Sequence, residues 1–194
     1  MTTQVWSPQT AYIITDILKG NTDPAENGVW SSYAQIAARN GQRRPAALKT
    51  GTSNDAKDLN AYGYLAPPSR QGRQNGEYAL SVGVWAGNSN GSPVTTVANP
   101  VFSLDVAAPL WDAFLTDVTS SWEVRDFRQP SGLSRRTVDA WTGHIPSPYS
   151  KRSYNELFVT GTAPTTDPYL RSVQVIKGSD GDWYRWNDAC EGTP

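Results

Sequence analysis

Cysteine and histidine are nearly missing from this chain of 194 residues, which has one of each, Cys190 and His144. A single thiol cannot form an intramolecular disulfide, and one cysteine with one histidine cannot supply the four ligands of a structural zinc site. We expect Cys190 to be inert, because no second cysteine or neighbouring histidine accompanies it. The sequence therefore predicts no disulfide framework, no metal site and no cofactor.

Long hydrophobic runs and an excess of either charge are also missing. No stretch of about twenty apolar residues occurs, and the first four residues have neither the basic nor the apolar region of a targeting signal. The 17 Lys and Arg nearly cancel the 18 Asp and Glu, so no net field attracts nucleic acid or an anionic membrane. We expect no membrane span and no nucleic-acid partner, with any anchoring signal outside this sequence.

The composition is that of a folded, turn-rich chain, with 38% apolar residues, 16 Gly and 14 Pro. Two segments show helical spacing. The first runs from Ser7, a capping residue, to about Lys19, with Pro8 at the favoured first helical position, and the second opens at residues 107–109. We expect each helix to bury one apolar stripe. The stripes are Ala11, Ile14, Ile17 and Leu18, and then Leu110, Trp111, Phe114, Leu115 and Val118.

Three strand-like segments lie between these helices, at residues 45–52, 60–66 and 78–87. Their short connections favour an antiparallel meander. Residues 33–39 are compatible with a further short helix, and the apolar stretches at 157–159 and 173–176 indicate short strands near the carboxy terminus. The predicted fold class is therefore α+β, an antiparallel sheet flanked by helices, followed by an irregular tail that contains β-structure.

One motif has mechanistic content, the sequence Lys-Thr-Gly-Thr at Lys49 to Thr52. It falls on a predicted strand, has no side chain at Gly51 to block a ligand, and offers an ammonium group and two hydroxyls. In serine acyltransferases of the penicillin-recognising type, such a strand accompanies Ser-x-x-Lys and Ser-x-Asn elements. The motif suits the capture of a carboxylate beside an edge strand.

The residues around this motif resemble the class A, bifunctional penicillin-binding proteins over nearly the whole chain. The resemblance implies a partial serine β-lactamase/transpeptidase-like fold. It assigns residues 1–122 to the carboxy-terminal portion of the transpeptidase domain and residues 123–194 to a carboxy-terminal tail. The segments that carry the resemblance, in order, are residues 7–18, 46–58, 61–67, 82–88, 107–114 and 156–164.

The resemblance also implies roles for the motif residues. Lys49, Thr50 and Gly51 would form the motif wall of the catalytic site, with Lys49 acting electrostatically. Thr50, Thr52 and Ser53 would contact the substrate or the carboxylate of a β-lactam. The backbone N–H of Thr52 would supply one of two oxyanion-hole donors.

The departures from the family pattern concern the nucleophile and the pocket. No Ser-x-x-Lys occurs, and Ser153 to Asn155 matches Ser-x-Asn by letter but lies after the Lys-Thr-Gly strand, whereas the family has it before. Leu48 replaces a usual glycine, and Asn60 stands near a usually aromatic position. Without a serine to acylate, we expect this chain alone to be catalytically silent. We also expect the sheet to lack strand partners and the first helix to lack burial surface.

The implied partners are peptidoglycan stem peptides and β-lactams, bound through the complete parent domain, and the amino-terminal part of that domain. The implied location is extracytoplasmic, at the cell envelope, through an anchor not present in this sequence. An alternative is a non-catalytic peptidoglycan-binding or interaction module derived from the domain. Tryptophan stacking on glycan, at Trp183 to Trp186, would serve that alternative. His144 has no identifiable nucleophile nearby, so we interpret it as a turn residue.

Overall fold

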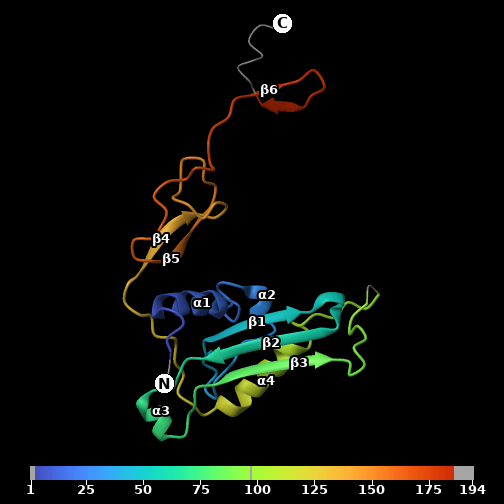
Figure 1. The fold of residues 1–194 in the computed structure, drawn as a ribbon, viewed down its shortest axis with the longest axis vertical. Helices are drawn as coiled ribbons and strands as arrows, with labels where there is room; N and C mark the ends of the chain where they lie inside the picture. The colour runs from blue at the N-terminus through green and yellow to red at the C-terminus, as the bar shows by residue number, and fades with distance from the viewer. Residues whose placement is uncertain (1–2, 97, 186–194) are drawn as a thin grey trace. The chain divides into compact units, whose positions relative to one another are not determined.

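The computed structural model describes residues 3–96 and 98–185, and the chain divides into two compact units, residues 1–131 and 132–194 (Figure 1). The first unit contains a three-stranded sheet with helices around it, and the second contains two hairpins. The elements of the first unit are α1 (Pro8–Gly20), α2 (Gly28–Ser31), β1 (Ala46–Thr52), the 3-10 turn η1 (Asn54–Ala56), β2 (Asp58–Leu65), α3 (Arg70–Gln74), β3 (Ser81–Gly87) and α4 (Ala107–Thr119).

The three strands of the first unit form an antiparallel meander in the order β1-β2-β3. Leu48 is opposite Gly63 across the first pair, and Asn60 is opposite Trp85 across the second. The predicted strands and their antiparallel connection are thus confirmed, with bounds that shift by at most three residues. β1 and β3 are the two edges of this sheet.

Helices α4 and α1 contact opposite faces of the sheet. The residues of β2 that each helix contacts show this, because successive side chains of a strand point to opposite faces. The fully buried Ala61 packs in one cluster with Trp111 of α4, whose indole Nε1–H donates to the carbonyl of Val82 at 3.2 Å. Three residues along β2, and therefore on the other face, the hydroxyl of Tyr64 bonds that of Thr15 in α1 at 2.8 Å. The core lies between the sheet and α4.

Helix α1 begins as predicted, with the Ser7 hydroxyl accepting the backbone N–H of Thr10 at 3.1 Å. The predicted buried stripe is wrong: Ala11 is exposed, and Ile14 and Ile17 are 51% and 59% exposed. The helix instead buries Thr15, which bonds Tyr64 of β2, and its last residue, Gly20. Apolar spacing identifies one face of a helix, but it does not say whether a partner covers that face.

The predicted stripe of α4 divides in the same way. Trp111 and Leu115 are fully buried against the sheet, whereas Leu110, Phe114 and Val118 are exposed. The two sets lie one residue apart on the helix, so they form adjacent faces, of which only one meets the sheet.

The short helix considered at residues 33–39 is also wrong, and α2 lies just before it. Ala34, Ile36 and Ala38 are buried while their neighbours are more exposed, a period of two that is typical of extended chain. An isolated bridge between Ala37 and Arg43 holds this segment. Three small or branched apolar residues at alternate positions therefore pack an extended segment into the core.

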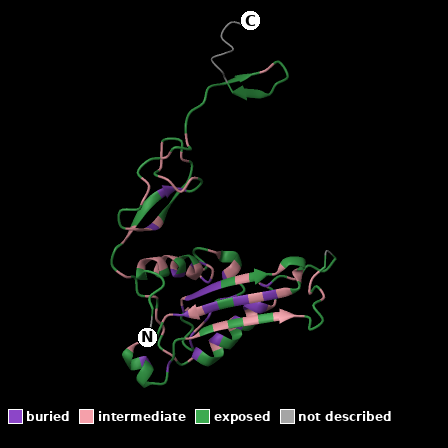
Figure 2. Ribbon diagram, viewed as in Figure 1, coloured by how far each residue is buried: buried purple, intermediate pink, exposed green. Residues whose placement is uncertain are grey.

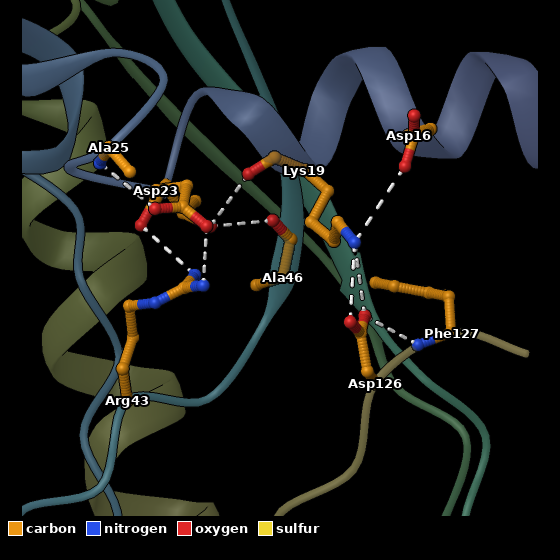
Figure 3. Close-up of polar contacts among 9 residues, drawn as sticks. Asp16, Lys19, Asp23, Ala25, Arg43, Ala46, Asp126 and Phe127 are labelled. Atoms are coloured by element: carbon orange, nitrogen blue, oxygen red, sulfur yellow. Dashed lines mark hydrogen bonds and ion pairs between the residues drawn. The ribbon is translucent and has the colours of Figure 1, made fainter. Parts of the chain in front are cut away.

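Two neighbouring arginines tie the segment before β1 to the rest of the unit. Arg43 pairs with Asp23 at 2.6 Å, as Figure 3 shows. Arg44 is only 4% exposed, and its guanidinium donates to the carbonyls of Thr119, Trp122 and Glu123 at 2.7 to 3.0 Å. It thereby caps the carboxy-terminal end of α4.

Lys19, at the end of α1, bonds Asp126 at 3.2 Å and lies 3.7 Å from Asp16 (Figure 3). Burial is the largest single influence and acts to lower the pKa of Lys19. The charge and hydrogen bond of Asp126, together with the weaker charge interactions of Tyr12 and Asp16, outweigh burial, so the pKa is raised. The pair joins α1 to the segment that follows α4.

Within the described residues, no helix is long and apolar enough to cross a membrane.

The second unit is built on the antiparallel pair of β4 (Leu133–Asp139) and β5 (Ser153–Val159). Val138 and Leu157 are buried on these strands. Figure 2 shows short buried stretches on the larger hairpin of the second unit and none on the smaller one. A smaller hairpin pairs β6 (Val175–Lys177) with β7 (Trp183–Arg185). The predicted tail strands at 157–159 and 173–176 overlap β5 and β6, while Trp186 and Cys190 lie outside the described residues.

Candidate functional site

The first half of the β1 edge is covered by the chain that follows α1. The hydroxyl of Thr22 donates to the carbonyl of Ala46, and the side-chain amide of Asn21 donates to the carbonyl of Leu48, both at 2.8 Å. In an antiparallel strand, alternate residues point both backbone groups to the same side. Ala46 and Leu48 therefore face away from β2, and their outward carbonyls are satisfied within the unit.

The second half of the β1 edge has no such cover from α1. By the same alternation, Thr50 and Thr52 direct their backbone groups away from β2. The outward carbonyl of Thr50 accepts the ammonium group of Lys49 at 2.6 Å. The N–H of Thr52 thus points to the free side of the sheet, where a ligand can reach it. We refer to residues 49–53 as the edge site.

Lys49 is exposed, and its ammonium group lies 5.0 Å from the ring centroid of Trp30. A cation over an indole face gains roughly 0.5–1 kcal/mol at an exposed position. The aromatic ring and the Thr50 carbonyl together hold the positive charge beside the strand.

The two threonines of the edge site differ in their hydrogen bonds. The Thr52 hydroxyl bonds that of Ser103 at 3.1 Å, and the Ser103 hydroxyl donates to the carbonyl of Gly51 at 2.7 Å. Ser103 is only 3% exposed, so this network is anchored in the unit. Within the described part of the chain, the Thr50 hydroxyl has no hydrogen-bond partner. It is therefore the hydroxyl of the motif that is free to bind a ligand.

The space at Gly51 is open. A Cβ atom placed there would meet no other heavy atom within 4 Å, in contrast to Gly63 on the neighbouring strand, where the carbonyl of Ala47 would lie 2.3 Å away. Leu48, which departs from the family pattern, is fully buried in the core cluster. This departure fills the core rather than the outer side of the strand.

The turn after β1 is held by Ser53 and Asp58. The Ser53 hydroxyl donates to the Asp58 carboxylate at 2.7 Å and accepts the Asp58 backbone N–H at 2.9 Å. The Trp85 indole N–H donates to the other carboxylate oxygen at 2.9 Å. The Ser53 hydroxyl and then the indole lower the pKa of Asp58, so a charged carboxylate fixes the end of the edge site.

The five residues of the edge site are those that the sequence motif predicted, and their roles stay predictions. The contacts of Trp30, Ser103 and Asp58 with these residues were not predicted. Nothing in the local pattern connects Trp30 or Ser103 with a strand twenty to fifty residues away. The other candidates, His144 and the segment Ser153–Asn155, lie in the second unit. No group of His, Cys, Asp and Glu within the described residues could hold a metal ion.

Comparisons with known proteins bear on both units. Residues 129–166 match the family model described as "Penicillin-binding protein 1A, C-terminal domain". Penicillin-binding protein 1A of Clostridium botulinum is 29% identical over 170 residues, which are 84% of this chain and 18% of that protein. The protein of the same name from Clostridium novyi is 30% identical over 182 residues, 90% of this chain and 18% of that protein. The chain thus spans less than a fifth of the length of these relatives.

A solved structure is also similar, the penicillin-binding protein 1A of Haemophilus influenzae. The TM-score is 0.59, with 22% sequence identity, over 86% of this chain and 22% of that one. This likeness confirms the predicted fold class, an antiparallel sheet with flanking helices. Over most of its length, the chain is therefore a relative of the class A penicillin-binding proteins and corresponds to the carboxy-terminal part of their sequences.

Proposed function

We propose that the edge site is the carboxylate-binding wall of a peptidoglycan D,D-transpeptidase, an enzyme that crosslinks cell-wall peptides by serine acyl transfer. The observation that carries this proposal is the open half of the β1 edge. There, an ammonium group, an unpartnered hydroxyl and an outward N–H follow one another within four residues, next to a glycine with free space around it. Such an edge accommodates an extended peptide or a β-lactam.

Each residue has a proposed role in this wall. Lys49 supplies positive charge near the reacting groups, and Thr50 binds the carboxylate of the stem peptide or β-lactam through its free hydroxyl. The Thr52 N–H serves as one oxyanion-hole donor, a contribution of about 100- to 1,000-fold in related acyl-transfer systems. The Thr52 hydroxyl is already hydrogen-bonded to that of Ser103, and it would bind the carboxylate while keeping this bond. Ser53 would reach substrate only by exchanging its bond to Asp58.

The nucleophile of this reaction would come from residues outside the sequence described. This sequence contains no Ser-x-x-Lys, and the threonines of the edge site have no general base beside them among the described residues. The chain alone would therefore bind weakly and form no acyl-enzyme. The wall becomes part of a catalytic site only in the complete parent domain.

The amino-terminal part of the parent domain is the proposed partner of this chain. Its support is apolar surface on three elements of the first unit: Ile14 and Ile17 on α1, Leu110 and Phe114 on α4, and Trp85 on the edge strand β3 are all at least 50% exposed. Surface of this kind marks contact with further protein. The proposed location is extracytoplasmic, at the cell envelope, where the crosslinked peptides lie.

The proposal is tested by reading the genomic sequence upstream of Met1 and labelling both gene products with a fluorescent penicillin. We expect in-frame Ser-x-x-Lys and Ser-x-Asn elements upstream, covalent label on the longer product, and none on residues 1–194 alone. An upstream stop codon with an independent start would favour the alternative, a non-catalytic peptidoglycan-binding module. Covalent, β-lactam-dependent label on this chain alone would contradict the missing nucleophile.

A further inference from the structure

The second unit contains a concave site that the transpeptidase proposal does not use. A cavity of about 350 Å³ opens in the loop that joins β4 to β5. This volume is at the lower end of the roughly 300–1,000 Å³ of small-molecule sites, and suits one ring with a substituent. We call it the loop pocket. Its lining consists of Asp139, Ala140, Trp141, Tyr149, Lys151, Arg152 and Leu170.

Two aromatic side chains of the loop pocket are open to solvent. Trp141 is 92% exposed and Tyr149 is 54% exposed. An indole left almost wholly in water buries nothing in its own chain, so it contributes no packing that would explain its presence. A flat, exposed aromatic face beside a cavity is suited to stack against a planar or ring-shaped ligand.

The loop pocket is also positively charged. Lys151 and Arg152 are exposed, and neither has an ion-pair or side-chain hydrogen-bond partner among the described residues. The one carboxylate in the lining, Asp139, is buried and already accepts the backbone N–H groups of Trp141 and Thr142 at 2.8 and 2.9 Å. The two cations therefore remain available for an anionic ligand, and Arg and Lys both favour carboxylates.

The polar contacts of the loop hold the pocket in a fixed shape. The Asp139 carboxylate sets the turn that presents Trp141. The Thr142 hydroxyl donates to Asp167 at 2.6 Å, and the other oxygen of Asp167 accepts the N–H of Leu170 at 3.2 Å. This chain of bonds brings the Leu170 segment to the side of the loop. The backbone of the loop is therefore held in place before any ligand binds, so the ordering cost of binding is limited to the exposed side chains of the pocket.

The backbone of the loop pocket argues against a peptide ligand. The N–H of Ala140 donates to the carbonyl of Arg152 at 2.9 Å, and that of Trp141 is taken by Asp139. β4 ends and β5 begins at the mouth of the loop, so no free strand edge lines the cavity. Extended peptides are usually bound through such edges. A sugar ring needs none, because its C–H face stacks on an aromatic plane and its substituents take the hydrogen bonds.

From these contacts we propose that the loop pocket binds a sugar ring that carries a carboxylate. Trp141 and Tyr149 would stack on the apolar face of the ring, Lys151 and Arg152 would bind the carboxylate, and Leu170 would contact an apolar substituent. The inference uses the second unit alone, so it does not depend on the edge site or on a nucleophile. Its failure and that of the transpeptidase proposal are separately observable.

The test is a titration of the full chain with N-acetylmuramic acid and with N-acetylglucosamine, which is the same ring without the lactyl carboxylate. Binding is followed by NMR chemical shifts. We expect the acid to bind at least about fivefold more tightly, with affinity that falls as salt is raised. Trp141→Ala should weaken binding of the acid about tenfold or more. Trp183→Ala is the same substitution at a 68% exposed tryptophan outside the pocket, and it should leave binding of the acid unchanged.

A second variant separates charge from shape. Lys151→Gln with Arg152→Gln should bring the affinities for the two sugars to within about twofold of each other, and both residues are exposed, so folding should not change. Equal binding of the two sugars by the unaltered chain would overturn the proposal. So would unchanged binding in Trp141→Ala, or tighter binding of an acetylated glutamyl dipeptide than of N-acetylmuramic acid.

Discussion

Two glycines on neighbouring strands should respond in opposite ways to the same added methyl group. At Gly63 in β2, a Cβ atom would lie 2.3 Å from the carbonyl oxygen of Ala47 and 2.5 Å from Cζ2 of Trp111. At Gly51 in β1, it would meet no atom within 4 Å. Gly63→Ala and Gly51→Ala therefore form a matched pair that tests the close packing of α4 and the openness of the edge site.

The expected magnitudes follow from these distances. A backbone oxygen cannot move away as a side-chain end can, so the Gly63 variant should incur an overpacking cost of about 1–3 kcal/mol. If Trp111 shifts, its bond to the Val82 carbonyl is lost as well, at about 1 kcal/mol. The Gly51 variant should keep the same free energy of unfolding or gain up to about 1 kcal/mol, because alanine lowers the conformational entropy of the unfolded chain.

The assay is urea unfolding of the full chain followed by tryptophan fluorescence, since Trp111 lies in the affected core. With a slope of about 1–3 kcal/mol per molar urea, a loss of about 3 kcal/mol lowers the midpoint by at least about 1 M. The Gly51 variant should keep the midpoint of the unaltered chain. Equal losses in both variants would refute the reasoning, because the edge site would then be as crowded as the core.

Three further predictions concern stability. Arg44→Ala should lower the free energy of unfolding by about 3 kcal/mol in chemical denaturation, because it removes the donor to three carbonyls at and after the end of α4. Arg43→Ala, which breaks a single partly exposed ion pair, should cost about 1 kcal/mol or less. Hydrogen bonds from the Ser150 hydroxyl and from backbone N–H groups lower the pKa of Asp139. The contribution of Asp139 to the free energy of unfolding should therefore be complete above the pKa of an unfolded aspartate, about 4, and should be lost as the pH falls towards the lowered pKa of the folded state. Thermal unfolding against pH should show a smaller acid loss in Asp139→Asn than in the unaltered chain, because other carboxylates with lowered pKa values, such as Asp58, still contribute. An equal acid loss in the two proteins would contradict the prediction. Ile14→Gln with Ile17→Gln should change the melting temperature of this chain little, since both residues are exposed, but should lower that of the longer gene product by several degrees if further protein covers them.

The strands and the two long helices could be predicted because local chemistry determines them. Ser7 and Pro8 place the start of α1, and alternation with short polar turns places the meander. The first and last residues of the strands depend on pairing with neighbouring strands, which a local sequence pattern does not contain. Residues 33–39 were misjudged because alanine-rich sequence favours a helix, while the period-two burial of Ala34 and Ile36 appears only once α4 and the sheet are present.

Burial of the helix faces was less predictable than the helices themselves. The spacing of Ile14 and Ile17 indicates an apolar face but carries no information on what lies against it, and here that face meets water. The five residues of the edge site followed from the motif and the family resemblance. Ser103, which holds the Thr52 hydroxyl, comes from a distant loop and could be found only in three dimensions. The roles of the five residues of the edge site remain predictions, as does the predicted domain boundary between residues 122 and 123.

The central claim is that the edge site binds the carboxylate of a substrate in a penicillin-reactive domain. The most direct test is the acylation rate of the longer gene product by a fluorescent penicillin, compared with its Thr50→Val and Ser53→Ala variants. Loss of the free Thr50 hydroxyl should slow acylation about 10- to 100-fold, because a hydrogen bond to a charged group is lost. Ser53→Ala should have a much smaller effect, since that hydroxyl is held by Asp58. An unchanged rate in Thr50→Val would contradict the account.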